Sequence, residues 1–309
     1  MLPTQSGSLR LFRFRGIDVF VHWSWFLYPL YRIQTWQEDY ASPIWKAYEC
    51  LALFGIVLLH EFGHSLACRQ TGGRADRIVL WPLGGVAFVD PPPRAGATLW
   101  SIAAGPLVNV VLVPVLFGLS TFAADHWFET APETVQFLRN INQINLGLLI
   151  FNLLPIYPLD GGQILRSLLW FWLGRARSLM VAASLGFVGV AGLAALAVWA
   201  ESYWLGLIAY FAATQCWRSL QHARGLARVE NAPLRPGIAC PVCHAAPPTG
   251  NFWGCSRCRQ AFDTFATQGV CPQCQTRYES TRCTACGQMQ PLPLWYPAAP
   301  DLPPPLPPV

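Results

Sequence analysis

Charged side chains are scarce in this chain of 309 residues. Asp, Glu, Lys and Arg together make up 12% of the sequence, whereas hydrophobic residues make up 53%. An ordinary globular domain has about 25% charged residues. The chain also lacks a solenoid-type repeat period, and its first 16 residues lack the pattern of a removable signal peptide. This composition argues against a soluble domain and favours a membrane protein.

Apolar runs recur along the first three quarters of the chain. We interpret them as six membrane spans, although the first, fourth and sixth are shorter than the about 20 residues that cross a bilayer comfortably. The predicted spans are residues 19–33, 47–68, 99–124, 141–159, 178–200 and 203–217.

Basic residues separate into two groups under this assignment. Thirteen arginines fall before the first span, in alternate loops and after the sixth span, and three basic residues fall on the opposite side. Basic residues concentrate on the cytoplasmic side of membranes, so we expect a multi-pass protein with both termini in the cytoplasm. The thirteen are Arg10, Arg13, Arg15, Arg69, Arg74, Arg77, Arg94, Arg166, Arg175, Arg177, Arg218, Arg224 and Arg228, and the three are Arg32, Lys46 and Arg139.

The second apolar run ends in the sequence His-Glu-Phe-Gly-His at residues 60–64. On a helix, His60 and His64 lie one turn apart on one face and can bind one zinc ion. Glu61 can accept a proton from a zinc-bound water. Ionisable groups at membrane depth are costly and usually mark a functional site. The motif therefore predicts a metal centre within the membrane.

Asp160, at the end of the fourth run, is the candidate third ligand. Pro155 and Pro158 forbid a regular helix just before it. Irregular backbone at membrane depth is tolerated where it is buried in protein or lines a wet cavity. The second and fourth spans both run toward the cytoplasm, so both motifs reach the same half of the bilayer. The alternative is that Asp160 caps the helix predicted at 163–171.

The loop between the second and third spans predicts a β-hairpin. Two short β-prone runs flank Gly84 and Gly85, and Pro82 limits the first run to an edge strand. The alternative is a loop on the membrane surface.

Eight cysteines form four Cys-x-x-Cys pairs, a spacing typical of metal sites rather than disulfides. We predict two structural zinc sites of four thiolates each; the pairing, sequential or interleaved, stays open. Reduced thiols fit a cytoplasmic position, and the few nearby arginines argue against nucleic-acid binding. The ligands are Cys240, Cys243, Cys255, Cys258, Cys271, Cys274, Cys283 and Cys286.

Composition divides the chain into four parts. We predict a six-helix membrane domain at 1–228, a linker at 229–239, a double zinc-ribbon-like domain at 240–289 and a Pro-rich disordered tail at 290–309. The predicted fold class is an all-α polytopic membrane protein with a short β-hairpin between the second and third helices and a small zinc-ribbon appendage.

Six motifs together resemble the site-2 protease family, zinc intramembrane metalloproteases, in its compact bacterial and archaeal branch. The resemblance covers about residues 1–225 and lacks the inserted PDZ domain and the CBS pair of some members. The motifs are HEFGH at 60–64, AGPLVN at 104–109, NLLP at 152–155, PLDGG at 158–162, PLGGV at 82–86 and GIDVFVHW at 16–23.

The resemblance implies the roles of five site residues. Zinc would be held by His60, His64 and Asp160, with Glu61 as the general base. Asn152 would contact the substrate carbonyl or stabilise the oxyanion.

The resemblance also implies that the hairpin near Gly84 and Gly85 holds an unwound substrate, which a free strand edge could capture. We therefore expect a zinc endopeptidase in a prokaryotic cell membrane. It would cleave transmembrane segments of membrane proteins by attack of a zinc-bound water, with a cytosolic regulator at the Cys-rich unit. One alternative is a catalytically silent binding or chaperone protein on this scaffold. A second, ranked lower, is a metal transporter.

Several other polar positions within the apolar segments carry weaker expectations. His22 fits an interfacial or hydrogen-bonded core position better than a site role. Gly105 fits close helix packing, and Asn109 could orient a metal ligand. Gln143 and Asn145 are expected to form hydrogen bonds between helices.

Overall fold

The computed structural model describes residues 7–27, 40–81 and 84–296. The chain divides into two compact units, residues 1–221 and residues 222–309. The first unit holds a four-stranded sheet and most of the long helices, and the second is a small unit that contains the eight paired cysteines.

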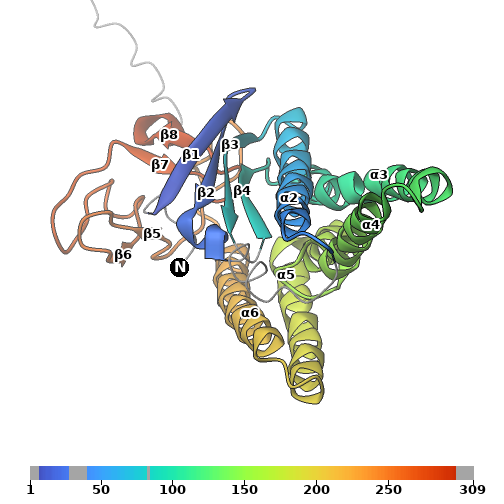
Figure 1. The fold of residues 1–309 in the computed structure, drawn as a ribbon. Helices are drawn as coiled ribbons and strands as arrows, with labels where there is room; N and C mark the ends of the chain where they lie inside the picture. Colours follow the sequence, from blue (N-terminus) through green and yellow to red (C-terminus); the bar gives the residue numbers. More distant parts are fainter. Residues whose placement is uncertain (1–6, 28–39, 82–83, 297–309) are drawn as a thin grey trace, which may run out of the picture. The chain divides into compact units, whose positions relative to one another are not determined.

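The sheet of the first unit is larger than the predicted hairpin (Figure 1). In spatial order its strands are β1 (Ser8–Phe14), β2 (Ile17–His22), β3 (Arg74–Trp81) and β4 (Gly84–Asp90). β2 and β3 are parallel, and the two outer pairs are antiparallel. The hairpin prediction is confirmed as β3–β4. The first run is, however, the inner strand β3, which pairs with both β2 and β4, and not the edge strand expected from Pro82; β4 lies at the edge of the sheet.

The start of the first predicted span is a strand, so that prediction is wrong there. Ile17, Val19 and Val21 are buried and alternate with half-buried residues, which is the pattern of a strand with one face in a core. A short 3-10 helix, Trp23–Phe26, follows β2. The remainder of that span, at 28–33, lies outside the described residues.

Five long helices follow in the described part of the chain (Figure 1). They are α2 (Ile44–Gln70), α3 (Ala95–Trp127), α4 (Pro132–Leu153), α5 (Asp160–Trp199) and α6 (Tyr203–Glu230).

Three of these helices, α2, α3 and α5, are long and apolar enough to cross a membrane. The prediction of six spans is therefore not confirmed for the described residues. α4 falls short because amide side chains such as Asn142 and Asn145 are spread along it, and α6 because its second half carries Arg218, Arg224 and Arg228.

The outward surfaces of the spanning helices are apolar. Val111 and Phe117 of α3 are 58% and 59% exposed, and Val188 and Val198 of α5 are 71% and 80% exposed. Soluble proteins rarely expose large contiguous apolar patches, whereas lipid requires them.

One face of the sheet packs on α2. Ile17, Ile78 and Leu80 form a buried cluster with Phe54 and Leu58 of that helix. This packing holds the β3–β4 hairpin beside the turn of α2 that carries the His-Glu-Phe-Gly-His motif.

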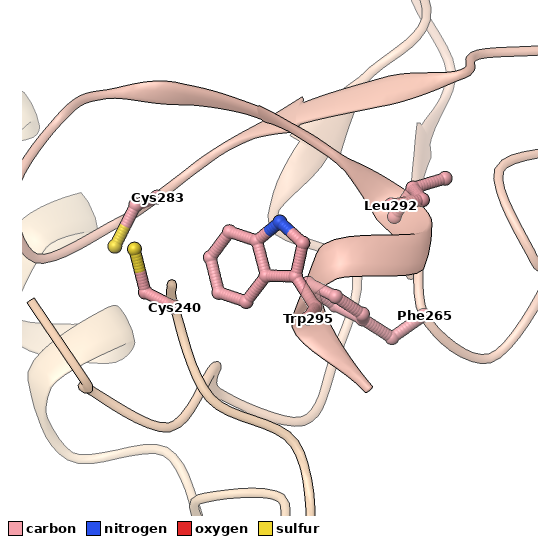
Figure 2. Packing of buried hydrophobic residues seen from close by; sticks show 5 residues of the cluster. All are labelled: Cys240, Phe265, Cys283, Leu292 and Trp295. Atoms are coloured by element: carbon pink, nitrogen blue, oxygen red, sulfur yellow. The ribbon is translucent and has the colours of Figure 1, made fainter. Parts of the chain in front are cut away.

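The second unit consists of two small hairpins and a 3-10 helix. β5 (Trp253–Gly254) pairs with β6 (Ala261–Phe262), and β7 (Ser280–Arg282) pairs with β8 (Met289–Pro291); η2 (Leu292–Trp295) follows. Figure 2 shows its core, in which the Trp295 indole lies among Cys240, Cys283, Leu292 and Phe265.

The predicted disordered tail at 290–309 needs correction at its start. Residues 290–296 form part of β8 and all of η2, and Leu292 and Trp295 fill the core of the unit. An apolar pair such as Leu292 and Trp295 can anchor a Pro-rich segment in a core, and the overall composition of the segment does not reveal it. Residues 297–309 lie outside the described part.

Replacement of Trp295 by alanine tests this correction. Trp295 is 2% exposed and its ring lies 5.0 Å from that of Phe265. We expect Trp295→Ala to destabilise the second unit by about 3–5 kcal/mol, because it removes a buried aromatic ring and leaves a cavity. Urea-dependent proteolysis of the full chain measures this loss.

Tyr296→Ala is the matched control, because Tyr296 is 41% exposed and adjacent in sequence. It should leave the proteolysis midpoint nearly unchanged. Equal effects of the two substitutions would contradict the assignment of 290–296 to the folded unit.

Candidate metal centre

Three potential metal ligands converge where α2 meets the start of α5. The Nε2 atoms of His60 and His64 lie 3.0 Å apart. The Asp160 Oδ2 atom lies 3.0 Å from His60 Nε2 and 3.5 Å from His64 Nε2. Tetrahedral zinc with bonds of about 2.0–2.1 Å spaces its ligand atoms by about 3.3 Å. The three atoms therefore have the spacing of ligands around one ion.

The opposite ring nitrogens of the two histidines are already engaged. His64 Nδ1 lies 2.9 Å from the Ser101 carbonyl oxygen, and His60 Nδ1 lies 2.6 Å from the Asn109 amide oxygen. Both oxygens accept, so each Nδ1 donates its proton and each Nε2 keeps a lone pair. Two lone pairs and a carboxylate oxygen thus face one point, an arrangement that a cation stabilises.

A hydrogen-bond network fixes the histidine orientation from α3 and α4. The Asn109 amide donates to the Asn145 side-chain oxygen at 2.8 Å, and the Asn145 amide donates to the Asn109 carbonyl oxygen at 3.1 Å. Both side chains are almost fully buried. Asn145 therefore makes an interhelical contact of the kind expected from the sequence, whereas Gln143 is exposed.

Glu61 lies beside these ligands and contacts the edge strand. Its Oε2 atom accepts the N–H of Ala87 in β4 at 2.8 Å. A Cβ atom at Gly85 would lie 2.4–2.6 Å from the Glu61 side chain, so only glycine leaves room for that side chain in this position. β4 therefore holds the carboxylate of the candidate base through backbone groups.

Gly105 of α3 allows the same close approach to the histidines. A Cβ atom there would lie 2.3 Å from the His64 imidazole and 2.9 Å from His60 Nε2. The close packing expected at Gly105 is thus packing against His60 and His64, two of the candidate metal ligands.

The centre is buried. His60, Glu61 and His64 are each 6% exposed, and the Asp160 side chain is 13% exposed. Buried carboxylates are costly unless they are paired with a cation or neutralised. Asp160 is the first residue of α5, so it also lies at the helix N-terminus, as the capping alternative required. Its carboxylate nevertheless points to the histidines, and the donor set fits Zn²⁺.

The other residues singled out in the sequence lie elsewhere or have no contact of this kind. Asn152 is half-buried in the last turn of α4, and its role stays a prediction. Gly84 pairs with Trp81 at the start of β4. His22 caps the 3-10 helix after β2 through its contacts with Ser24. Two contacts of the site could not be predicted from the sequence: that of His64 with the Ser101 carbonyl oxygen and that of Glu61 with the Ala87 N–H. Both use backbone groups, which are the same for every residue type.

The eight paired cysteines gather into two groups. One group contains Cys240, Cys243, Cys283 and Cys286, and the other contains Cys255, Cys258, Cys271 and Cys274. In each group the sulfur atoms lie within 4.8 Å of one another. The arrangement is nested: the first and last pairs enclose the middle two, rather than the sequential or interleaved pairing considered from the sequence.

The inner group favours the thiolate form at one ligand. The Tyr278 hydroxyl lies 3.1 Å from the Cys255 sulfur; this hydrogen bond and the N–H of Cys258 lower the pKa of the Cys255 thiol to about 5. Thiolates are the form that binds zinc.

Gly105→Ala tests the geometry of the metal centre. Because the new methyl group would displace His64, we expect bound zinc to fall by about one ion per chain, with zinc at the cysteine groups retained. Metal analysis of the purified, folded protein measures this. Gly118→Ala in the same helix is the control, because nothing lies within 4 Å of its Cβ position. Equal zinc content in both variants would contradict the convergence of ligands.

Comparisons with known proteins agree on one family. The model of "Peptidase family M50" matches residues 48–140 and 126–196. The solved structure of the site-2 protease from Methanocaldococcus jannaschii matches with a TM-score of 0.52 and 30% sequence identity, over 69% of this chain and 95% of that chain.

Curated relatives give the same result. The zinc metalloprotease MJ0392 of Methanocaldococcus jannaschii is 35% identical over 179 residues, which is 58% of this chain and 50% of that protein. Stage IV sporulation protein FB of Bacillus subtilis is 36% identical over 124 residues, 39% of each chain. The chain thus spans about half or less of the length of these relatives. With three helices of membrane-spanning length, it is an integral membrane protein. It belongs to peptidase family M50, the site-2 protease family.

Proposed function

We propose that this protein is an intramembrane zinc endopeptidase that cleaves transmembrane segments of other membrane proteins. One observation carries the proposal: His60, His64 and Asp160 present three ligand atoms to one point, with the Glu61 carboxylate beside them, on helices long enough to span a bilayer. The relatives named as zinc metalloproteases support the same reaction class.

The residues of the chain divide the work of hydrolysis. Zinc at this centre would supply a polarised, activated water. Glu61 takes a proton at its carboxylate and returns it to the amide nitrogen that leaves. The Ala87 N–H keeps the carboxylate in place for both transfers. Asn109 and Ser101 hold the two imidazoles so that their Nε2 atoms face the metal. Asn152 is assigned to the substrate carbonyl.

A substrate helix must unwind before its peptide bonds can be attacked. β4 is an edge strand, and it contacts the candidate base at Ala87 and Gly85. An extended substrate paired with the part of β4 that starts at Gly84 would lie next to Glu61. We assign Gly84 and Gly85 to substrate binding on this basis.

The orientation and the metal content belong to the same proposal. Both termini are assigned to the cytoplasm of a prokaryotic cell, on the arginine distribution along the six spans predicted from the sequence. One zinc ion is catalytic, and two structural ions occupy the cysteine groups. A groove of about 370 Å³ in the second unit, lined in part by Phe252, Trp253, Tyr278 and Met289, is suited to a cytosolic protein regulator.

Glu61→Gln is the decisive substitution. It keeps the shape of the side chain and removes the proton acceptor, so we expect cleavage of a transmembrane substrate to fall by about 10²–10⁴-fold. Zinc content should not change, because Glu61 is not a ligand in this proposal. Comparison of membrane-protein fragments between cells with the wild-type and the variant protein measures the loss and reveals substrates.

Glu129→Gln is the control, since Glu129 is exposed after α3. It should cleave at the wild-type rate. Retained turnover in Glu61→Gln would refute the assignment of the base. A wild-type protein that binds zinc and cleaves nothing would instead indicate the catalytically silent alternative.

A further inference from the structure

Two arginines of α5 surround one tryptophan just beyond the metal centre. The guanidinium carbon of Arg166 lies 5.7 Å from the centroid of the Trp170 ring, and that of Arg175 lies 5.8 Å from it. Both contacts are cation–π interactions. We propose that Arg166 and Arg175 form a binding site for the headgroup phosphate of an anionic phospholipid.

The break at Gly174 creates this arrangement. Gly174 has φ 75° and ψ 175°, which interrupts the helix between the two arginines. On a regular helix, residues nine positions apart lie about 180° apart around the axis. The interruption therefore lets Arg175 reach the ring that Arg166 also contacts, and the chain accepts a left-handed glycine at this point.

The two positive charges have no counter-charge in the described part of the chain. No described Asp or Glu forms an ion pair with either arginine, and the Nε atoms of both are buried without a hydrogen-bond partner. The two charges are near enough to repel each other, and the side-chain partner of Arg166 is the hydroxyl group of Tyr157, by a hydrogen bond, rather than a carboxylate. Uncompensated charges near a bilayer are costly. The oxygens of a phosphate group can accept the paired, charge-assisted hydrogen bonds that a planar guanidinium group donates.

The surroundings match the lipid headgroup region. Phe171, Trp172 and Leu173 are 56%, 78% and 38% exposed. Exposed aromatic residues next to arginines are typical of the membrane–water interface. Phe171 also lies 3.9 Å from the Cβ position of Gly96, in the first turn of α3. That turn carries no acidic residue and has no side-chain cap, so its N-terminus adds positive potential.

This site lies close to the metal centre along the chain. Arg166 is six residues after Asp160 on the same helix, less than two turns away. A bound headgroup would order the segment 160–173 and with it the carboxylate of Asp160. The lipid site itself does not depend on the proposed protease activity.

Native mass spectrometry of the full-length protein in mild detergent tests the site. Phosphatidylglycerol is the probe, with phosphatidylcholine and inorganic phosphate in parallel arms. We expect phosphatidylglycerol to bind at lower concentration than either. Arg166→Gln with Arg175→Gln should raise its half-saturating concentration by about tenfold, because two charge-assisted contacts are lost.

Arg177→Gln is the matched control, an exposed arginine two residues beyond Arg175. It should change the half-saturating concentration less than about twofold, since it removes one surface charge without a built contact. If the double glutamine variant does not fold, Arg166→Lys with Arg175→Lys keeps both charges. We expect severalfold weaker binding from it, because lysine lacks the planar fork.

Hydrogen exchange gives an independent measure. Phosphatidylglycerol should slow exchange in residues 160–173 of the wild-type protein and not in the double variant. Glu61→Gln should bind the lipid like the wild type, so a failed protease proposal leaves this result intact. Equal lipid affinity of the double variant and Arg177→Gln would overturn the proposal. So would inorganic phosphate that binds as well as the lipid, or unchanged exchange at 160–173.

Discussion

Three buried ligand atoms that face one point are the constraint on which the first unit depends. The Nε2 lone pairs of His60 and His64 and the Asp160 carboxylate lie within 3.0–3.5 Å of one another. Without a cation this arrangement concentrates negative potential in a site that water barely reaches, which is unfavourable. With one, the same atoms become a stable coordination sphere. The contacts of Asn109 and Ser101 then have a clear purpose, because they stop the imidazoles from turning away. Residues from α2, α3, α4 and α5 thus together hold the candidate ligands around a single point.

The candidate base has a separate support. Glu61 lies on the same helix as the histidines, but its carboxylate is fixed by the backbone of β4 rather than by another helix. The position of the Glu61 carboxylate therefore depends on the position of β4. A peptide that pairs beside β4 would be placed relative to Glu61 by hydrogen bonds of the main chain, whatever its side chains are. Recognition through the main chain would fit the proposed substrates, because apolar helices offer few polar features for recognition.

The sequence predicted the grouping of these residues better than the fold around them. His60, Glu61 and His64 are fixed by helical spacing, and Asp160 stands out because prolines interrupt an apolar run, so residue type alone indicates both. The strand Ile17–His22 was taken as the start of a span, since a short apolar run does not distinguish a strand from a buried helix. The backbone contacts of Ser101 and Ala87 carry no residue signal. Likewise, four Cys-x-x-Cys pairs of similar spacing leave several pairings possible, and tertiary packing selects the nested one.

The nested pairing has a consequence for how the second unit is closed. Its outer group joins Cys240 near the start of the unit to Cys283 and Cys286 near its end. The N–H of Ala239 donates to the Trp295 carbonyl oxygen at 3.0 Å, and the Trp295 side chain packs beside the same group. The outer cysteine group, the main chain and the Trp295 indole therefore close the same loop. In so small a unit, an ion held by each cysteine group would contribute to the folding energy. The nested pairing therefore ties the two ends of the unit together, which a sequential pairing of the cysteines would not do.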